Sequence, residues 1–149
     1  MDLGLAALIA WLATAGLGSV LVVMWAMRVS ARDRYGRPRH GQPPPYIPRR
    51  LLIAHVAVAS AGLAAWAGAL AVHQDGFGWI ALGSLLVVAA LGVSMFLRWL
   101  GSRRARRASR GHGAPVESWL PTAVVLGHGL LGVLTVLLVV LSYLRLGRP

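Results

Sequence analysis

The sequence predicts an all-α integral membrane protein, a four-helix bundle that forms a single domain over residues 1–149. Two observations support this prediction. The chain is 57% hydrophobic and only 13% charged, which is too apolar for a soluble domain of this size. Four segments without a charged residue have about the 20 residues that a helix needs to cross a bilayer, and they cover approximately residues 3–27, 51–72, 79–97 and 119–144.

The first segment, residues 3–27, follows Asp2 and ends at Arg28. It is longer than the apolar region of a signal peptide, and no positive residue precedes it. We therefore expect a permanent membrane anchor. The second segment, residues 51–72, follows a proline-rich stretch whose last member, Pro48, fits the first turn of a helix.

The third segment, residues 79–97, is separated from the second by a short turn without a basic residue. The fourth segment, residues 119–144, follows a second arginine-rich stretch. Thirteen of the fifteen arginines lie in residues 28–50 and 98–118, so the positive-inside rule places both loops in the cytoplasm and both termini outside. The absence of lysine, with many Ala, Gly and Val residues, is typical of a high-GC bacterial genome. This composition predicts that the protein lies in the bacterial inner (plasma) membrane.

Two histidines, His55 and His128, lie inside the second and fourth segments. An ionisable side chain within a membrane is costly unless it is bound, so each is a candidate functional residue. His55 lies five residues past Arg50, about 7 Å into the helix, whereas His128 lies nine residues past Trp119, about 13 Å. Counted in this way, the two rings differ in depth by about one helical turn and still permit a ligand held between them.

The order of helices and loops predicts a parallel two-fold internal repeat, in which helices one and two correspond to helices three and four. The arginine that closes each first helix precedes the histidine by 27 residues in one half, from Arg28, and by 30 in the other, from Arg98. Repeats of this kind are related by an axis along the membrane normal. Such an axis brings the second and fourth helices across from one another, with both rings pointing inward.

Small residues follow each histidine by four positions, Ala59 after His55 and Gly132 after His128. They share a helix face with the imidazoles and leave room for a flat macrocycle, although close helix packing uses the same residues. Arg50 and Arg98 lie near the cytoplasmic side, where arginine pairs with carboxylates. Lipid phosphate is the alternative partner for both.

This arrangement resembles the four-helix membrane b-type cytochromes, and His55 and His128 carry the resemblance. It implies haem b between helices two and four, with both histidines as iron ligands and Arg50 and Arg98 beside the propionates. It also implies electron transfer with other membrane or redox subunits, and quinone as a further candidate partner, although no quinone site is visible. The chain departs from the two-haem members because the outer side offers only His73.

The alternative function is a non-redox accessory or assembly subunit of a larger membrane complex, such as a respiratory complex, in which the histidines only pack. A small transporter is disfavoured because the spans contain no carboxylate, and Glu117 is expected outside them. Two histidines are too few for zinc, and His40 and His112 fall in loops. Nothing indicates nucleic-acid binding, or catalysis by the chain on its own.

Overall fold

The computed structural model describes residues 2–35, 46–72, 75–108 and 115–146. It contains four long helices, α1 (Leu3–Tyr35), α2 (Arg49–Val72), α3 (Asp75–Ala108) and α4 (Thr122–Leu146), and one short 3₁₀ helix, η1 (Val116–Trp119). The four long helices are long and apolar enough to cross a membrane. The predicted all-α four-helix bundle is therefore confirmed.

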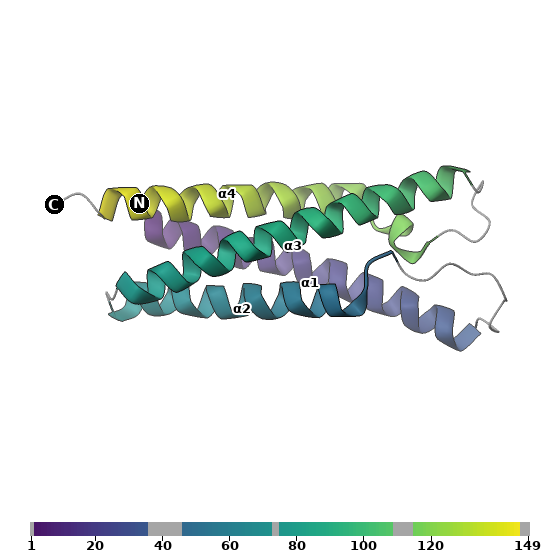
Figure 1. The fold of residues 1–149 in the computed structure, drawn as a ribbon, viewed down its shortest axis with the longest axis horizontal. Coiled ribbons are helices and arrows are strands. Elements are labelled where there is room, and N and C mark those ends of the chain that lie inside the picture. Colours follow the sequence, from purple (N-terminus) through teal and green to yellow (C-terminus); the bar gives the residue numbers. More distant parts are fainter. Residues whose placement is uncertain (1, 36–45, 73–74, 109–114, 147–149) are drawn as a thin grey trace.

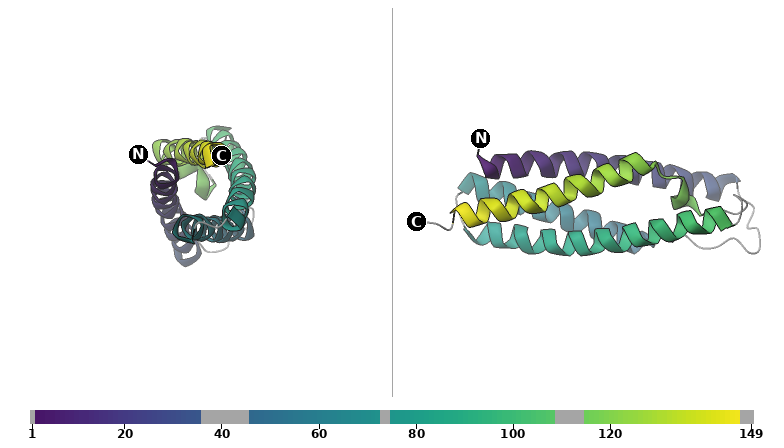
Figure 2. Two further views of the ribbon diagram at one scale, coloured as in Figure 1. Left: turned by 90° about the vertical axis from the view of Figure 1, so that its left-hand side faces the viewer. Right: turned by 90° about the horizontal axis from the view of Figure 1, so that it is seen from above.

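The helices run alternately up and down, so both arginine-rich connections lie at one end of the bundle, which we call the arginine-rich end (Figure 1). Seen along its axis, the bundle is a ring in which α1 packs closely on α4 and α2 packs closely on α3 (Figure 2). The helices α2 and α4, which carry His55 and His128, lie diagonally across the ring. Both histidines can therefore reach the bundle axis.

The helix ends differ from the predicted spans in one consistent way. The helices α1 and α3 continue beyond residues 27 and 97 to Tyr35 and Ala108. The arginines in these extensions of α1 and α3 therefore lie on helix and not in loops. The reason is that backbone hydrogen bonding does not stop at the membrane surface, and arginine and alanine are good helix formers.

A proline fixes the start of both α2 and α4. The carbonyl of Pro48 accepts hydrogen bonds from the N–H groups of Leu51 and Leu52, and the carbonyl of Pro121 accepts one from Val125. The helix α4 consequently begins at Thr122, three residues later than the predicted span. This late start changes the depth of His128, as described below.

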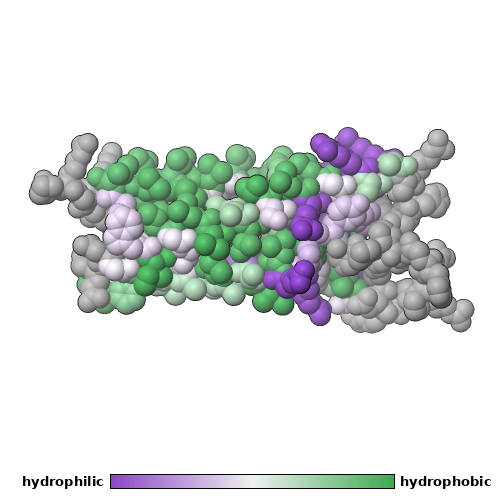
Figure 3. Space-filling model, viewed as in Figure 1, coloured by the Kyte–Doolittle hydropathy of each residue, from purple (hydrophilic) through white to green (hydrophobic). Residues whose placement is uncertain are grey.

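The core consists of two hydrophobic clusters along the axis. The larger cluster, at the end opposite the arginines, is built around Trp11 and Trp66, and the indole N–H of Trp66 donates to the carbonyl of Gly4. The smaller cluster, at the arginine-rich end, contains Trp25, Trp99 and Leu120. The outer face is apolar along most of its length, with polar side chains gathered toward the arginine-rich end (Figure 3). This surface is the one that a lipid bilayer requires.

Candidate functional site

The two histidines meet between the two hydrophobic clusters. Their ring centroids are 6.2 Å apart, and the ring planes are inclined at 64°. Both residues are half-buried. Each ring is carried by one of the two diagonal helices, so the pair spans the centre of the bundle.

The ring of His128 is held in a defined tautomer by a backbone carbonyl. Its Nδ1 atom lies 2.9 Å from the carbonyl oxygen of Thr14 on α1. A carbonyl oxygen only accepts hydrogen bonds, so Nδ1 carries the proton and Nε2 keeps its lone pair. Histidines that bind metals are typically oriented in this way, with the second ring nitrogen donating to a carbonyl or carboxylate.

The ring of His55 has a matching position against α3 but no matching hydrogen bond. The backbone of Val88 lies beside this ring. In the part of the chain that the structure describes, however, no hydrogen bond to the buried Nδ1 atom of His55 is formed. A buried nitrogen without a partner is unfavourable by about 1–3 kcal/mol. This ring therefore lacks the anchor that fixes His128.

Two glycines allow the rings to lie against the neighbouring helices. A Cβ atom added to Gly18 on α1 would lie 3.0 Å from Cε1 of His128, and one added to Gly92 on α3 would lie 3.4 Å from Cε1 of His55. The space beside each glycine is thus taken by imidazole. The sequence interpretation, which looked only along the histidines' own helices, missed both glycines.

These contacts repeat with a constant spacing in the sequence. Residues of α1 correspond to residues of α3 at an offset of 74, which pairs Gly18 with Gly92. Residues of α2 correspond to residues of α4 at an offset of 73, which pairs His55 with His128. The same offsets pair core residues that have like positions: Ala7 with Ala81, Trp11 with Leu85, Trp25 with Trp99, Leu63 with Val136, and Trp66 with Val139.

This spacing corrects the choice of equivalent residues from which the internal repeat was counted. Arg28 corresponds to Ser102 at an offset of 74, and not to Arg98. Measured from the equivalent tryptophans, His55 follows Trp25 by 30 residues and His128 follows Trp99 by 29. The two halves therefore agree more closely than the arginines indicated.

The expected difference in depth between the rings is also wrong. His55 is six residues past Arg49, the first residue of α2, and His128 is six residues past Thr122, the first residue of α4. Pro121 sets the start of α4 deeper than Trp119, which removes the expected turn of mismatch. The rings lie at the same distance from the starts of their helices.

The separation of the two rings is one that a pair of imidazoles bound to a single metal ion would also have. Two imidazoles on opposite sides of one metal ion, with metal–nitrogen distances of about 2 Å, have ring centroids roughly 6 Å apart. The observed separation of 6.2 Å meets this requirement, and Nε2 of His128 is the nitrogen left for a metal. Among the described residues, no three His, Cys, Asp or Glu side chains come together. A metal ion held there would take its ligands among the described residues from His55 and His128.

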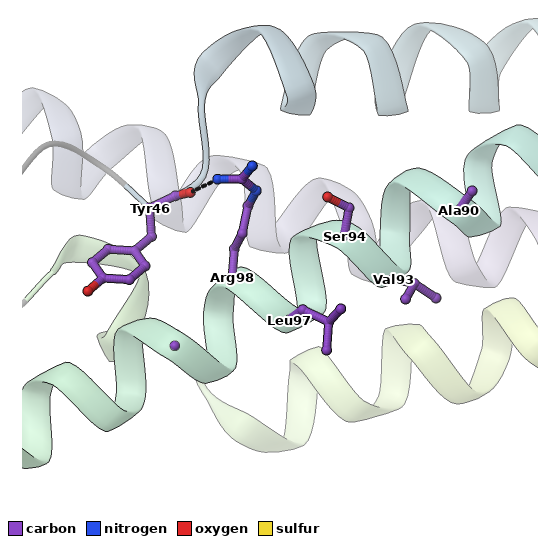
Figure 4. A pocket seen from close by; sticks show the side chains of 7 residues that line it. Tyr46, Ala90, Val93, Ser94, Leu97 and Arg98 are labelled. Atoms are coloured by element: carbon purple, nitrogen blue, oxygen red, sulfur yellow. Dashed lines mark hydrogen bonds between the residues drawn. The ribbon is translucent and has the colours of Figure 1, made fainter.

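The remaining predicted site residues lie around this pair. Arg50 is exposed on the first turn of α2, and the exposed Arg98 donates a hydrogen bond of 3.2 Å to the carbonyl of Tyr46. Figure 4 shows Arg98 reaching toward that carbonyl from a shallow groove on α3, which is lined by Tyr46, Ala90, Val93, Ser94, Leu97, Arg98 and Gly101. Ala59 is half-buried, and Gly132 faces Thr14 on α1. The small residue at 132 therefore serves helix packing. His40, His73 and His112 lie outside the described residues.

A second polar feature lies at the arginine-rich end, where the sequence indicated only a loop. Glu117, on η1, is fully buried. Its Oε1 atom accepts hydrogen bonds from the indole N–H of Trp25, at 3.4 Å, and from the backbone N–H of Ile47, at 3.2 Å. Its Oε2 atom has no hydrogen-bond partner in the described residues. This carboxyl group therefore links η1 to α1 and to Ile47, just before the start of α2.

Arginines of α3 hold η1 and the start of α4 in place. Arg106 donates to the carbonyl of Ser118 and lies 3.9 Å over the ring of Trp119. Arg103 donates to the hydroxyl of Thr122 and lies 5.1 Å from the centre of the Trp99 ring. These two side chains therefore have a packing role besides their charge.

Comparisons of the chain with protein-family models, with curated proteins and with solved structures found no match.

Proposed function

We propose that the chain is a membrane-embedded electron-transfer subunit of the b-type cytochrome kind, with one haem b between α2 and α4. The observation that carries the proposal is the histidine pair. The rings of His55 and His128 lie 6.2 Å apart across the bundle axis. They occupy equivalent places in the two halves, and the hydrogen bond to Thr14 leaves Nε2 of His128 available.

Different side chains would have different roles at such a site. His55 and His128 would bind the iron, and the carbonyl of Thr14 keeps one ring in the ligating tautomer. Arg50 and Arg98, at the arginine-rich end, are the candidates to pair with the propionates. The clusters around Trp11 and Trp25 exclude water on either side of the pair. Bound haem would supply one-electron redox chemistry, with a potential set by this environment.

The position of the site implies a partner. The histidines lie nearer the arginine-rich end, which the positive-inside rule places in the cytoplasm of a bacterial cell. The opposite half of the bundle is filled by Trp11 and Trp66. The subunit would thus exchange electrons on one side, with another membrane subunit, a redox domain or quinone. It would have no catalytic activity of its own.

Histidine variants test this proposal. His55→Ala and His128→Ala should each lose most of the haem from detergent-purified protein, because each removes one of two axial ligands. His40→Ala and His112→Ala are controls that remove a histidine from elsewhere in the chain, and they should retain it. Haem content is measured by absorbance per chain. Full retention in both His55→Ala and His128→Ala would contradict the assignment.

A specific observation also favours the alternative, a non-redox accessory subunit of a larger membrane complex. A separation of 6.2 Å at 64° is also ordinary for an edge-to-face ring pair, for which centroid distances of about 4.5–7 Å are favourable. In that case His55→Phe, which preserves a flat ring, should leave stability and complex assembly unchanged. The haem-binding function requires instead that His55→Phe loses haem while the fold persists.

A further inference from the structure

The shallow groove on α3 begins at the arginine-rich end and follows the helix toward its middle (Figure 4). Its lining residues on α3 recur every three or four positions, so they belong to one face of the helix: Ala90, Val93, Ser94, Leu97, Arg98 and Gly101. From Ala90 to Arg98 this face extends about 12 Å along the helix axis. Between these two residues Val93 and Leu97 are exposed and apolar. The groove therefore offers a path that a hydrocarbon chain of the bilayer can follow.

The mouth of the groove is positively charged. Arg98 is the first charged residue after the charge-free part of α3, so it lies where that helix reaches the membrane surface. Its exposed guanidinium donates a hydrogen bond of 3.2 Å to the carbonyl of Tyr46. A guanidinium has several N–H donors in a planar fork, so this bond positions the group and leaves donors for a phosphate. Among the described residues that line the groove, none is acidic.

The segment before α2 forms the wall at the mouth. The ring of Tyr46 lies against Gly101, where an added Cβ atom would be 3.5 Å from Cε1 of the ring. Arg49 and Arg50 follow Tyr46 within four residues and are both exposed. They add positive charge at the same end of the groove. A ligand that fits this site is therefore anionic at the mouth and apolar along α3.

The internal repeat shows that the charge at the mouth is particular to one half of the chain. At the offset of 74, Arg98 corresponds to Met24 on α1, and Met24 packs against the smaller core cluster. Membrane topology does not explain the difference, because Arg28 and Arg103 already mark the arginine-rich end on both helices. An exposed cation at position 98 therefore serves a purpose that the equivalent position does not.

We propose that this groove is a binding site for an anionic phospholipid. The phosphate accepts hydrogen bonds from the guanidinium of Arg98, and one acyl chain lies along Leu97, Val93 and Ala90. Charge and depth favour this occupant, because basic sites at the ends of transmembrane helices recognise anionic lipid head groups. The inference does not depend on the haem proposed above. It assigns Arg98 to the lipid and leaves Arg50 as the candidate for the haem propionates.

Native mass spectrometry of the detergent-purified protein, titrated with phosphatidylglycerol, tests the site. The wild type should bind a first lipid more tightly than the following ones. Phosphatidylcholine with the same chains has no net charge and should bind at least about fivefold more weakly. Arg98→Gln should lose this preference for phosphatidylglycerol. Arg104→Gln removes an exposed charge of the same helix outside the groove, and it should keep the preference.

A second pair of variants tests the apolar part of the groove without changing its charge. Ala90→Trp fills the end of the groove and should weaken binding of the first phosphatidylglycerol. Ala89→Trp places the same side chain at the adjacent exposed position, which does not line the groove, and should leave binding unchanged. This pair remains decisive if Arg98→Gln fails to fold. Glycerol phosphate, which lacks acyl chains, should not compete at equal concentration, and this distinguishes a lipid from free phosphate.

Three outcomes would overturn the proposal. Equal losses in Arg98→Gln and Arg104→Gln would show that the lipid binds the arginine-rich end through its overall charge. Equal affinity for the two lipids would show that Arg98 recognises no anionic head group. A quinone that copurifies with the wild type and is lost from Ala90→Trp, without a lipid preference in either, would identify a quinone site instead. None of these measurements depends on haem content, so the haem function is tested separately.

Discussion

At the scale of single residues, the closeness of the imidazoles to the neighbouring helices depends on two glycines. The backbone of Gly18 lies against His128 and that of Gly92 lies against His55, and a side chain at either position would meet the ring. Two other glycines of the same helices, Gly16 on α1 and Gly83 on α3, have no atom within 4 Å of an added Cβ. They provide matched controls for the same substitution.

We expect Gly18→Ala to destabilise the bundle by about 1–3 kcal/mol, the usual effect of overpacking, and to reduce haem binding because it displaces His128. Gly92→Ala should act in the same direction but more weakly, since its Cβ meets His55 at 3.4 Å and not at 3.0 Å. Gly16→Ala and Gly83→Ala should be neutral or slightly stabilising, because alanine is the better helix former. Thermal unfolding and haem content measure both effects. Equal behaviour of all four variants would contradict the ring–glycine contacts.

Only some residues of the site can be predicted from the sequence. His55 and His128 are predictable because a histidine in an apolar span is unusual by itself. Gly18 and Gly92 cannot be recognised among the 18 glycines, because the offset of 74 that relates them also relates Gly4 and Gly78. Glu117 is buried by partners 92 and 70 residues away, Trp25 and Ile47, and no local pattern predicts that packing.

At the scale of elements, η1 and the start of α4 determine the geometry of the arginine-rich end. Pro121 was a visible signal, since the equivalent Pro48 precedes α2 in the same way. Counting the depth of His128 from Trp119 overlooked this proline and introduced an error of one turn. The packing of η1 against α1 and α3, in contrast, depends on contacts that exist only in the folded chain.

Removal of the Arg106 side chain should loosen η1. Arg106→Ala loses the hydrogen bond to the Ser118 carbonyl and the contact with Trp119, a cation–π interaction of about 0.5–2 kcal/mol. Hydrogen exchange at the backbone N–H of Leu120, which bonds to the Glu117 carbonyl, should become faster. Arg107→Ala, which removes an exposed arginine of the same helix turn, is the control and should leave this exchange unchanged. Unaltered exchange in Arg106→Ala would show that η1 is held by other contacts.

At the scale of the whole molecule, the alternation of the helices places both arginine-rich connections at one end. The sequence predicted this arrangement because each segment is charge-free and the basic residues lie in alternate connections. The close pairing of α1 with α4 and of α2 with α3 was not stated by the sequence.

The orientation of the bundle in the membrane is tested by cysteine labelling, for which the cysteine-free chain is well suited. Gly76→Cys and Ala108→Cys place single thiols at exposed positions near the two ends of α3. A membrane-impermeant maleimide applied to intact cells should label the thiol at position 76 and leave that at position 108 unlabelled, because the positive-inside rule predicts that the arginine-rich end faces the cytoplasm. Both should react after the cells are opened. The reverse pattern in intact cells would show that the bundle has the opposite orientation in the membrane.

The number of redox centres that the bundle can hold is also determined at the scale of the whole molecule. The half of the bundle opposite the arginines is filled by Trp11, Trp66 and Val139, and no described histidine lies there. We therefore expect a single redox centre, between α2 and α4. A second centre would need space that these side chains occupy.

The most direct test of the central claim is the dithionite-reduced minus oxidised absorption spectrum of the detergent-purified wild-type protein, with haem counted per chain. Two neutral imidazole ligands predict a low-spin, six-coordinate b-type spectrum and a ratio close to one haem per chain. A folded, monodisperse protein that shows no b-type band after expression with ample haem would contradict the account. In that case His55 and His128 would be a packing pair in an accessory subunit.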